Sequence, residues 1–367
     1  MVNITKKPFS IAVGIFIILT AMLVFMAGCK KVEDNTKIGS NISEEPTQQT
    51  QEDTVLYLGK DAVSVEEYQM LAAEYCNQVY MRYTTEQVNS PDFWETEIDG
   101  VLPYTLLEEM ILDELKKNYA IKSLAIEQGV IENYTYADMM ASMQAENESR
   151  AESSNGEVSY GINNFEASSY YKYWYSNLET QLINSLILEK IDVSQEDCRN
   201  YYDQNDEDFA YEVGVSILYA EVPYASVSEK NEAAQIANRL YQAMQNTDSA
   251  EELADAFSIV SIEKIELNSL NTQAGMSGVY THRWELASQL DVGEVCGPYE
   301  EDWAFCVIKC IERTENGKLK YKDVKAQIES YLQAQEAQQM ISRKMKKLKV
   351  KEGTYSTKKA ILEATGK

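Results

Sequence analysis

The alternation of apolar and polar residues predicts a small sheet near the middle of a mostly helical chain. Val213–Val222 is a nearly continuous apolar run, which indicates a buried strand, and Ile262–Leu267 alternates as a half-buried strand does. Glu232–Met244 lies between them with helical spacing, and Trp303–Glu312 predicts a further strand. Residues 213–313 therefore predict a sheet with helices packed against it, which is an α+β arrangement.

Helical spacing dominates the residues before this stretch. After a short strand at Thr54–Leu58, Ser64-Val65-Glu66-Glu67 forms a capping-box pattern that predicts the start of a helix. A second helix is marked by four apolar residues spaced four apart, and Gly129 is its expected C-terminal cap. Those four residues are Leu107, Ile111, Leu115 and Tyr119. A polar stretch, Asn147–Asn164, is expected to be a loop.

The residues after the sheet predict one more long helix. Its sparse apolar stripe consists of Val324, Ile328, Leu332, Ile341, Met345 and Leu348. Nothing in the same segment can cover this stripe, so we expect the helix to fold back onto the N-terminal helices. The last residues, Glu352–Lys367, are polar and are expected to be frayed.

The N-terminus predicts a lipoprotein signal peptide, residues 1–28. Lys6 and Lys7 precede the apolar run Ile11–Phe25, and Ala27-Gly28-Cys29 provides small residues before a thiol that can carry lipid. The alternative is a plain membrane anchor, but the run is short of the roughly 20 apolar residues that a span needs. Residues 29–53 are polar and predict a disordered tether. We therefore expect attachment to the outer face of the cell membrane through lipid on Cys29.

Charge argues against nucleic acid as a partner. The chain has 33 basic and 59 acidic residues, a formal charge of −26, so a polyanion would be repelled. One basic run, Arg343–Lys351, has two interpretations. It is either a solvated helix end whose cations oppose the helix dipole, or a contact with anionic lipid or wall polymer.

The remaining chemistry excludes several enzyme classes. There is no phosphate-binding loop, no dinucleotide-binding glycine pattern and no Cys/His metal spacing, and His282 is the only histidine. We expect no metal and no cofactor. Cys76, Cys198, Cys296, Cys306 and Cys310 are interpreted as single thiols, although a disulfide stays possible outside the cytoplasm. Cys306 and Cys310 are four apart on one predicted strand, so they face the same side.

The order of the predicted elements resembles the extracytoplasmic foldases of the PrsA and SurA types. Val213–Val222, the helix Ser249–Ser258 and the turn Leu290–Val295 resemble a parvulin-type peptidyl-prolyl isomerase domain. Ile191–Phe209 resembles the linker helix of these foldases, and Tyr321–Leu348 resembles their closing helix. The resemblance covers most of residues 54–350. It implies a helical N-terminal chaperone module completed by a C-terminal helix, with the parvulin-like domain inserted.

The catalytic residues of the parvulin family are not matched in this chain. The family has one histidine in its first strand and one in its last. Aligned on Ile217-Leu218 and on Ala304–Ile308, their places are held by Ser216 and Cys306. With His282 as the only histidine, a two-histidine site is impossible, and we interpret His282 as a surface or capping residue. No catalytic residue is therefore assigned.

A dense aromatic cluster is the candidate for client binding. Its members are Tyr170, Tyr171, Tyr173, Trp174 and Tyr175. Their rings either pack against neighbouring helices or line a surface that holds unfolded polypeptides, because rigid amphipathic rings bind at low entropic cost.

We therefore expect a lipid-anchored, extracytoplasmic chaperone that binds unfolded secreted proteins, with a homodimer left open. One alternative is an isomerase with a non-standard site, and another is a solute-binding or wall-assembly lipoprotein that shares the fold. The expected domains are the tether 29–53, a helical module 54–212, a parvulin-like domain 213–313, a C-terminal helix 314–350 and a polar tail 351–367.

Overall fold

The computed structural model describes residues 54–153, 164–257, 260–270 and 278–366. The signal peptide, Cys29 and the tether lie outside the described residues, so these expectations stay predictions. Within the described ranges, no helix is both long and apolar enough to cross a bilayer.

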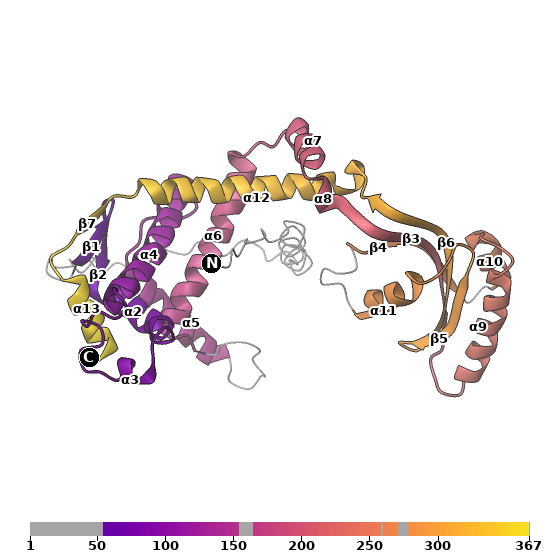
Figure 1. Ribbon diagram of the computed structural model, residues 1–367, viewed down its shortest axis with the longest axis horizontal. Helices are drawn as coiled ribbons and strands as arrows, with labels where there is room; N and C mark the ends of the chain where they lie inside the picture. Colours follow the sequence, from indigo (N-terminus) through magenta and orange to yellow (C-terminus); the bar gives the residue numbers. More distant parts are fainter. Residues whose placement is uncertain (1–53, 154–163, 258–259, 271–277, 367) are drawn as a thin grey trace. The chain divides into compact units, whose positions relative to one another are not determined.

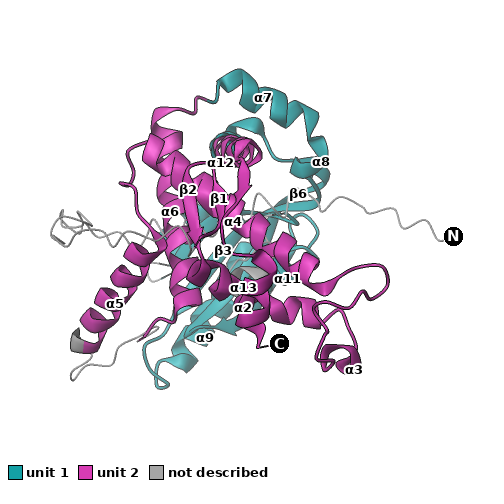
Figure 2. Ribbon diagram, turned by 90° about the vertical axis from the view of Figure 1, so that its left-hand side faces the viewer, with its two compact units in different colours: residues 1–36, 193–331 teal, residues 37–192, 332–367 magenta. Residues whose placement is uncertain are grey.

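The chain divides into two compact units, which Figure 2 colours separately. One unit, called here the sheet unit, contains residues 193–331. The other, the helical unit, contains the described residues before 193 together with those after 331. The helical unit is thus built from two parts of the chain that are separated in sequence. The domain limits expected from the sequence stay predictions.

The helical unit combines long helices with a three-stranded antiparallel sheet of order β2-β1-β7 (Figure 1). Its elements are β1 (Thr54–Leu58), β2 (Asp61–Ser64), α2 (Val65–Tyr80), α3 (Thr85–Val88), α4 (Pro103–Glu127), α5 (Tyr136–Ser153), α6 (Ala167–Glu189), the second half of α12 (Tyr321–Lys347), β7 (Val350–Glu352) and α13 (Thr357–Thr365). Together with the antiparallel sheet of the other unit, these elements confirm the predicted α+β class.

Capping and apolar spacing explain the two helices expected here. The Ser64 side chain accepts a hydrogen bond from the backbone N–H of Glu67, so α2 begins where the capping pattern placed it. The predicted stripe Leu107, Ile111, Leu115 and Tyr119 is buried along α4. Gly129 follows this helix with φ +69°, a left-handed conformation that suits glycine.

A buried carboxylate joins three helices of this unit. Glu67 of α2 is 2% exposed and accepts hydrogen bonds from Tyr119 of α4 at 2.8 Å and from Tyr171 of α6 at 2.9 Å. Burial is the main reason why the pKa of Glu67 rises to about 7, and the two phenols and Lys122 oppose the rise. The helix contacts are thus partly polar and pH-dependent.

Two expectations about polar stretches are wrong. The helix α5 continues through Ser153, into the stretch expected to be a loop. Within this helix the Asn147 side chain donates to the backbone oxygen of Phe165 at 3.0 Å and accepts from its N–H at 2.7 Å, which ties the helix to the residues just before α6. Residues 154–163 lie outside the described ranges.

The C-terminal residues are also ordered rather than frayed. β7 pairs antiparallel with β1, with Tyr57 opposite Lys351. The helix α13 packs on α2 and buries Ala360 and Ile361 completely. The sequence did not predict these contacts because α13 has few apolar residues. Those few residues are buried only by α2, which lies far away in the sequence.

The sheet unit contains a four-stranded antiparallel sheet of order β4-β3-β6-β5 (Figure 1). Its elements are α7 (Gln195–Gln204), α8 (Asp206–Phe209), β3 (Ala210–Pro223), α9 (Lys230–Met244), α10 (Ala250–Ala256), β4 (Ser261–Asn268), α11 (Gly278–Ala287), β5 (Val295–Glu301), β6 (Ala304–Lys318) and the start of α12. The expected strands and the helix α9 are present.

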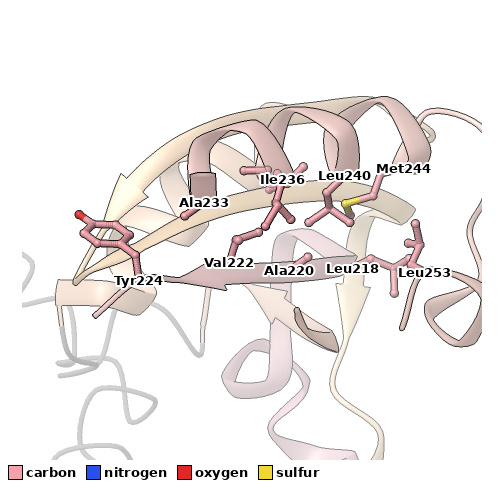
Figure 3. Packing of buried hydrophobic residues seen from close by; sticks show 11 residues of the cluster. Leu218, Ala220, Val222, Tyr224, Ala233, Ile236, Leu240, Met244 and Leu253 are labelled. Atoms are coloured by element: carbon pink, nitrogen blue, oxygen red, sulfur yellow. The ribbon is translucent and has the colours of Figure 1, made fainter. Parts of the chain in front are cut away.

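The two faces of this sheet have separate cores. Leu218, Ala220 and Val222 pack against α9 and α10 on one face, as Figure 3 shows. On the other face, Ile217, Tyr219 and their neighbours on β6 pack against the end of α11. This second face, called here the α11 face, contains both Cys306 and Cys310, as their spacing predicted.

Candidate functional site

Ser216 and Cys306, the positions matched to the parvulin site, are not brought together. Cys306 is paired with Glu221 of β3, five residues beyond Ser216, so about 16 Å of strand separates the two. Ser216 also points to the opposite face, because side chains alternate along a strand and Ile217 lies on the α11 face. The Ser216 hydroxyl is buried without a hydrogen-bond partner among the described residues.

Tyr219 and Glu221 are the side chains that meet Cys306. The Tyr219 hydroxyl lies 3.0 Å from the Cys306 Sγ, and it donates to Glu221 Oε1 at 2.6 Å. β3 places Tyr219 and Glu221 two residues apart and therefore on one face. The alternation is visible in the sequence, but matching Ile217-Leu218 to the parvulin pattern selects Ser216, which lies on the other face of β3.

Arg283 of α11 closes the cluster. Its guanidinium donates to Glu221 at 3.2 Å, lies 3.7 Å from the centre of the Tyr219 ring and is 3.7 Å from Glu301. The guanidinium is held by the cation–π interaction with the Tyr219 ring and by charge attraction to the two carboxylates. Arg283 thus attaches α11 to β3 and β5.

The electrostatics of this cluster do not favour proton transfer or nucleophilic attack. Burial raises the pKa of the Cys306 thiol to about 11, and the Tyr219 hydrogen bond only partly opposes this. The pKa of Tyr219 is also raised, mainly by burial and then by its hydrogen bonds to Cys306 and Glu221. Both groups stay protonated at neutral pH, and a neutral thiol is a poor nucleophile.

His282 lies beside this cluster rather than in it. Its side chain is 47% exposed, and Glu285 lies 3.9 Å away on the same helix. The ring meets Tyr299 of β5 edge-on, with 5.3 Å between the ring centres. Its exposure agrees with the expected surface histidine.

The aromatic cluster of α6 is divided between core and surface. Tyr170, Tyr171 and Tyr175 are buried, so their rings pack inside the helical unit. Tyr173 is 45% exposed and stacks on Phe165 at 5.1 Å between ring centres. Trp174 is half-buried and lies 4.2 Å from the Tyr134 ring. Of the five candidates, Tyr173 and part of Trp174 can meet a client, and their role stays a prediction.

An exposed tryptophan was not singled out from the sequence. Trp303 lies in the turn between β5 and β6, is 60% exposed and has φ +65°, while Asp302 before it has φ +42°. The Tyr224 ring supports it from 5.5 Å, and the Tyr224 N–H donates to the Trp303 carbonyl. Turns of this kind normally contain Asn or Gly, so a large apolar residue here is unusual.

The described part of the chain has no group of three or more His, Cys, Asp or Glu arranged for a metal ion. Cys76, Cys198, Cys296, Cys306 and Cys310 are all free thiols.

Comparisons with known proteins give the following similarities. No family model matches the chain. A chaperone for lacto-N-biosidase from Bifidobacterium longum is 29% identical over 130 residues, 35% of this chain and 46% of that protein, so the match spans less than half of the relative. Among solved structures, a SurA-like chaperone of Campylobacter jejuni is 13% identical and covers 82% of this chain and 98% of its own, with a TM-score of 0.30. The foldase PrsA of Streptococcus pneumoniae is 11% identical and covers 83% and 97%, with a TM-score of 0.27. The proteins to which the chain is similar are thus described as a chaperone for one enzyme, a SurA-like chaperone and the foldase PrsA.

Proposed function

We propose that this protein is an extracytoplasmic chaperone, attached to the membrane through lipid on Cys29, that binds unfolded secreted polypeptides. In this proposal the sheet unit is a parvulin-like scaffold without the histidine pair of the isomerases. The helical unit and the exposed rings of the sheet unit contact the client.

The packed cluster on the α11 face carries this proposal. Tyr219, Arg283 and Tyr299 surround the Cys306 thiol, and Tyr219 and Arg283 satisfy one another and the nearby carboxylates. A prolyl isomerase needs an apolar pocket for the proline ring and free polar groups around the twisted amide. Here Tyr219 binds Cys306 and Glu221, and Arg283 binds Glu221, while the Tyr299 hydroxyl is buried without a hydrogen bond among the described residues. The groups nearest the thiol are thus engaged with one another, which favours a structural role for this face.

The exposed aromatic residues supply a surface for clients. Trp303 and Tyr173 are both substantially exposed and both rest on another ring, so they are held in place before a client arrives. Rings with few rotatable bonds lose little entropy on binding. The formal charge of −26 supports solubility of a chaperone that exposes apolar surface.

The Bifidobacterium relative supports proteins, rather than small solutes, as ligands. That relative is a chaperone for one enzyme, lacto-N-biosidase. A solute-binding role for this chain predicts no effect on a denatured protein, so the same assay separates the two functions.

Suppression of aggregation tests the proposal. A chemically denatured secreted enzyme is diluted into buffer with the purified chain, without its signal peptide, and light scattering is followed. We expect scattering to fall as the chaperone approaches equimolar amounts, and to fall less with the double variant Trp303→Asn and Tyr173→Ser. Val292→Ser is the matched control, because Val292 is 62% exposed but lies outside the aromatic clusters. Unchanged scattering with the wild-type chain would overturn the proposal.

A non-standard isomerase is the second candidate, favoured by the contact between Tyr219 and Cys306 at 3.0 Å. Cis-to-trans conversion of a prolyl peptide, followed at high protein concentration, separates the two functions. We expect the rate to stay at the uncatalysed level. Acceleration that is lost in both Tyr219→Phe and Cys306→Ser would assign isomerase activity to the α11 face.

A further inference from the structure

The helical unit contains a cavity that no predicted site accounts for. Its volume is about 410 Å³, within the range of about 300–1,000 Å³ that is usual for ligand pockets. β1 contributes Val55 and Leu56, α2 contributes Tyr68, and α4 contributes Glu108 and Leu112. The remaining wall is β7 and the segment that follows it, through Thr357. The sheet, the helices and the C-terminal segment thus line one space that is partly open to solvent.

Tyr68 leaves a polar atom without a partner in the wall of this cavity. The residue is fully buried, and its hydroxyl has no hydrogen bond within the described ranges. Buried hydroxyls are normally paired, so the Tyr68 oxygen can still accept a hydrogen bond from a donor that enters the cavity wall. Glu108 is in the same wall, and its negative charge adds to burial in raising the pKa of the Tyr68 phenol. The phenol of Tyr68 and the carboxylate of Glu108 therefore belong to residues that line the same cavity.

The charged residues that line the cavity are both acidic. They are Glu108 and Glu352, and neither forms an ion pair with any other residue that the structure describes. The nearby lysines are engaged elsewhere: Lys351 lies over the Tyr57 ring at 5.7 Å, and Lys359 pairs with Glu363 at 3.8 Å. The cavity therefore offers acceptors for a cation and no cation of its own.

The apolar part of the wall complements this chemistry. Val55, Leu56 and Leu112 present hydrocarbon surface. The charged acceptors are Glu108 and Glu352, and neutral acceptors come from Tyr68 and from the hydroxyl-bearing residues of the segment 354–357. Arginine and lysine have the same division, since an alkyl stem packs on apolar surface and a cationic end seeks oxygen atoms. A guanidinium, with five donors, can serve the carboxylate and the phenol together.

We propose that this cavity binds an arginine or lysine side chain of the client polypeptide, with its stem against Val55 and Leu112 and its cationic end at Glu108 and Tyr68. This inference rests on the proposed chaperone function and names the chemistry of one client contact. It makes client choice depend on basic residues next to apolar ones.

Peptide binding tests the inference. A fluorescently labelled, extended peptide with one arginine between apolar residues is titrated with the protein, and anisotropy is measured. The same peptide with citrulline, which has nearly the same shape without the charge, is the comparison. We expect citrulline to weaken binding about tenfold, the loss of one charge-assisted contact.

Two matched variants locate the contact. Glu108→Gln should weaken binding of the arginine peptide about tenfold and leave the citrulline peptide unchanged. Glu109→Gln removes the same charge from the next residue of α4, which is exposed and not in the cavity wall, and should change neither. Tyr68→Phe removes the unpaired hydroxyl, so it should raise the melting temperature while weakening the arginine peptide a few fold.

Three results would overturn the inference. Equal affinity for the arginine and citrulline peptides would show that the cavity does not recognise the positive charge. Equal losses in Glu108→Gln and Glu109→Gln would assign the effect to overall charge. Binding of free arginine or spermidine without binding of the peptide would make this a small-molecule site. Aggregation suppression by the same wild-type preparation shows independently whether the chaperone proposal stands.

Discussion

Replacing Glu67 with glutamine should remove a pH dependence from the stability of the helical unit. The folded state raises the pKa of this carboxyl group from 4.5 to about 7, so folded Glu67 binds its proton more tightly than the unfolded chain does. Between about pH 4.5 and pH 7, the folded state therefore holds more protons, and stability falls as pH rises. Below this range both states are protonated, and above it both are ionised and the loss is complete.

The magnitude follows from the shift. Each unit of pKa difference corresponds to about 1.4 kcal/mol, so the free energy of unfolding should fall by about 3 kcal/mol between pH 4.5 and pH 8. In Glu67→Gln the side chain is neutral at every pH and keeps the shape needed to contact Tyr119 and Tyr171. In that variant the free energy of unfolding should therefore not show this fall of about 3 kcal/mol as pH rises.

The assay is urea unfolding followed by tryptophan fluorescence at several pH values. The chain has four tryptophans, so Trp284→Phe and Trp303→Phe leave Trp94 and Trp174, both in the helical unit, as reporters. The difference between the two proteins, rather than either curve alone, isolates Glu67 from other titrating groups. Parallel curves for wild type and Glu67→Gln would refute the reasoning.

Three further predictions concern other parts of the chain. Ile361→Ala should lower the free energy of unfolding of the helical unit by about 2–4 kcal/mol in urea, because Ile361 is fully buried, whereas Lys358→Ala at its exposed neighbour should cost under about 1 kcal/mol. Trp303→Asn should raise the stability of the sheet unit by about 1 kcal/mol in thermal unfolding, because Asn adopts positive φ more readily, and a loss of stability would contradict the observed turn. Iodoacetamide at pH 8 should modify Cys306 at least about 100-fold more slowly than a free thiol, because its pKa is about 11 and it is buried, and mass spectrometry showing rapid labelling would contradict this.

Local signals were sufficient for much of the fold. The Ser64 cap, the apolar stripe of α4 and the left-handed Gly129 each act within a few residues, so the helices they define were predictable. The strand β3 was also evident, since its apolar run is buried on both faces. These features depend on neighbours along the chain.

The candidate sites depend on register, which the sequence does not reveal. The pairing of β3 with β6 contains an irregularity between Ser216 and Ile217, and it places Glu221 opposite Cys306. A family alignment cannot locate such a shift without knowing which strand pairs hold. The cavity beside Tyr68 is harder still, because its walls come from segments separated by most of the chain.

The interleaving of the two units also constrains the order of folding during synthesis. β1 has β2 beside it early, but its second neighbour, β7, is synthesised only after the whole sheet unit. Until then, one edge of β1 and the surface of α2 that α13 covers stay exposed, and the Tyr68 cavity lacks one wall. A chain interrupted before β7 would thus keep its sheet unit but not a finished helical unit. A prematurely terminated product would therefore expose apolar surface of the helical unit and be open to proteolysis, whereas the sheet unit would already be protected.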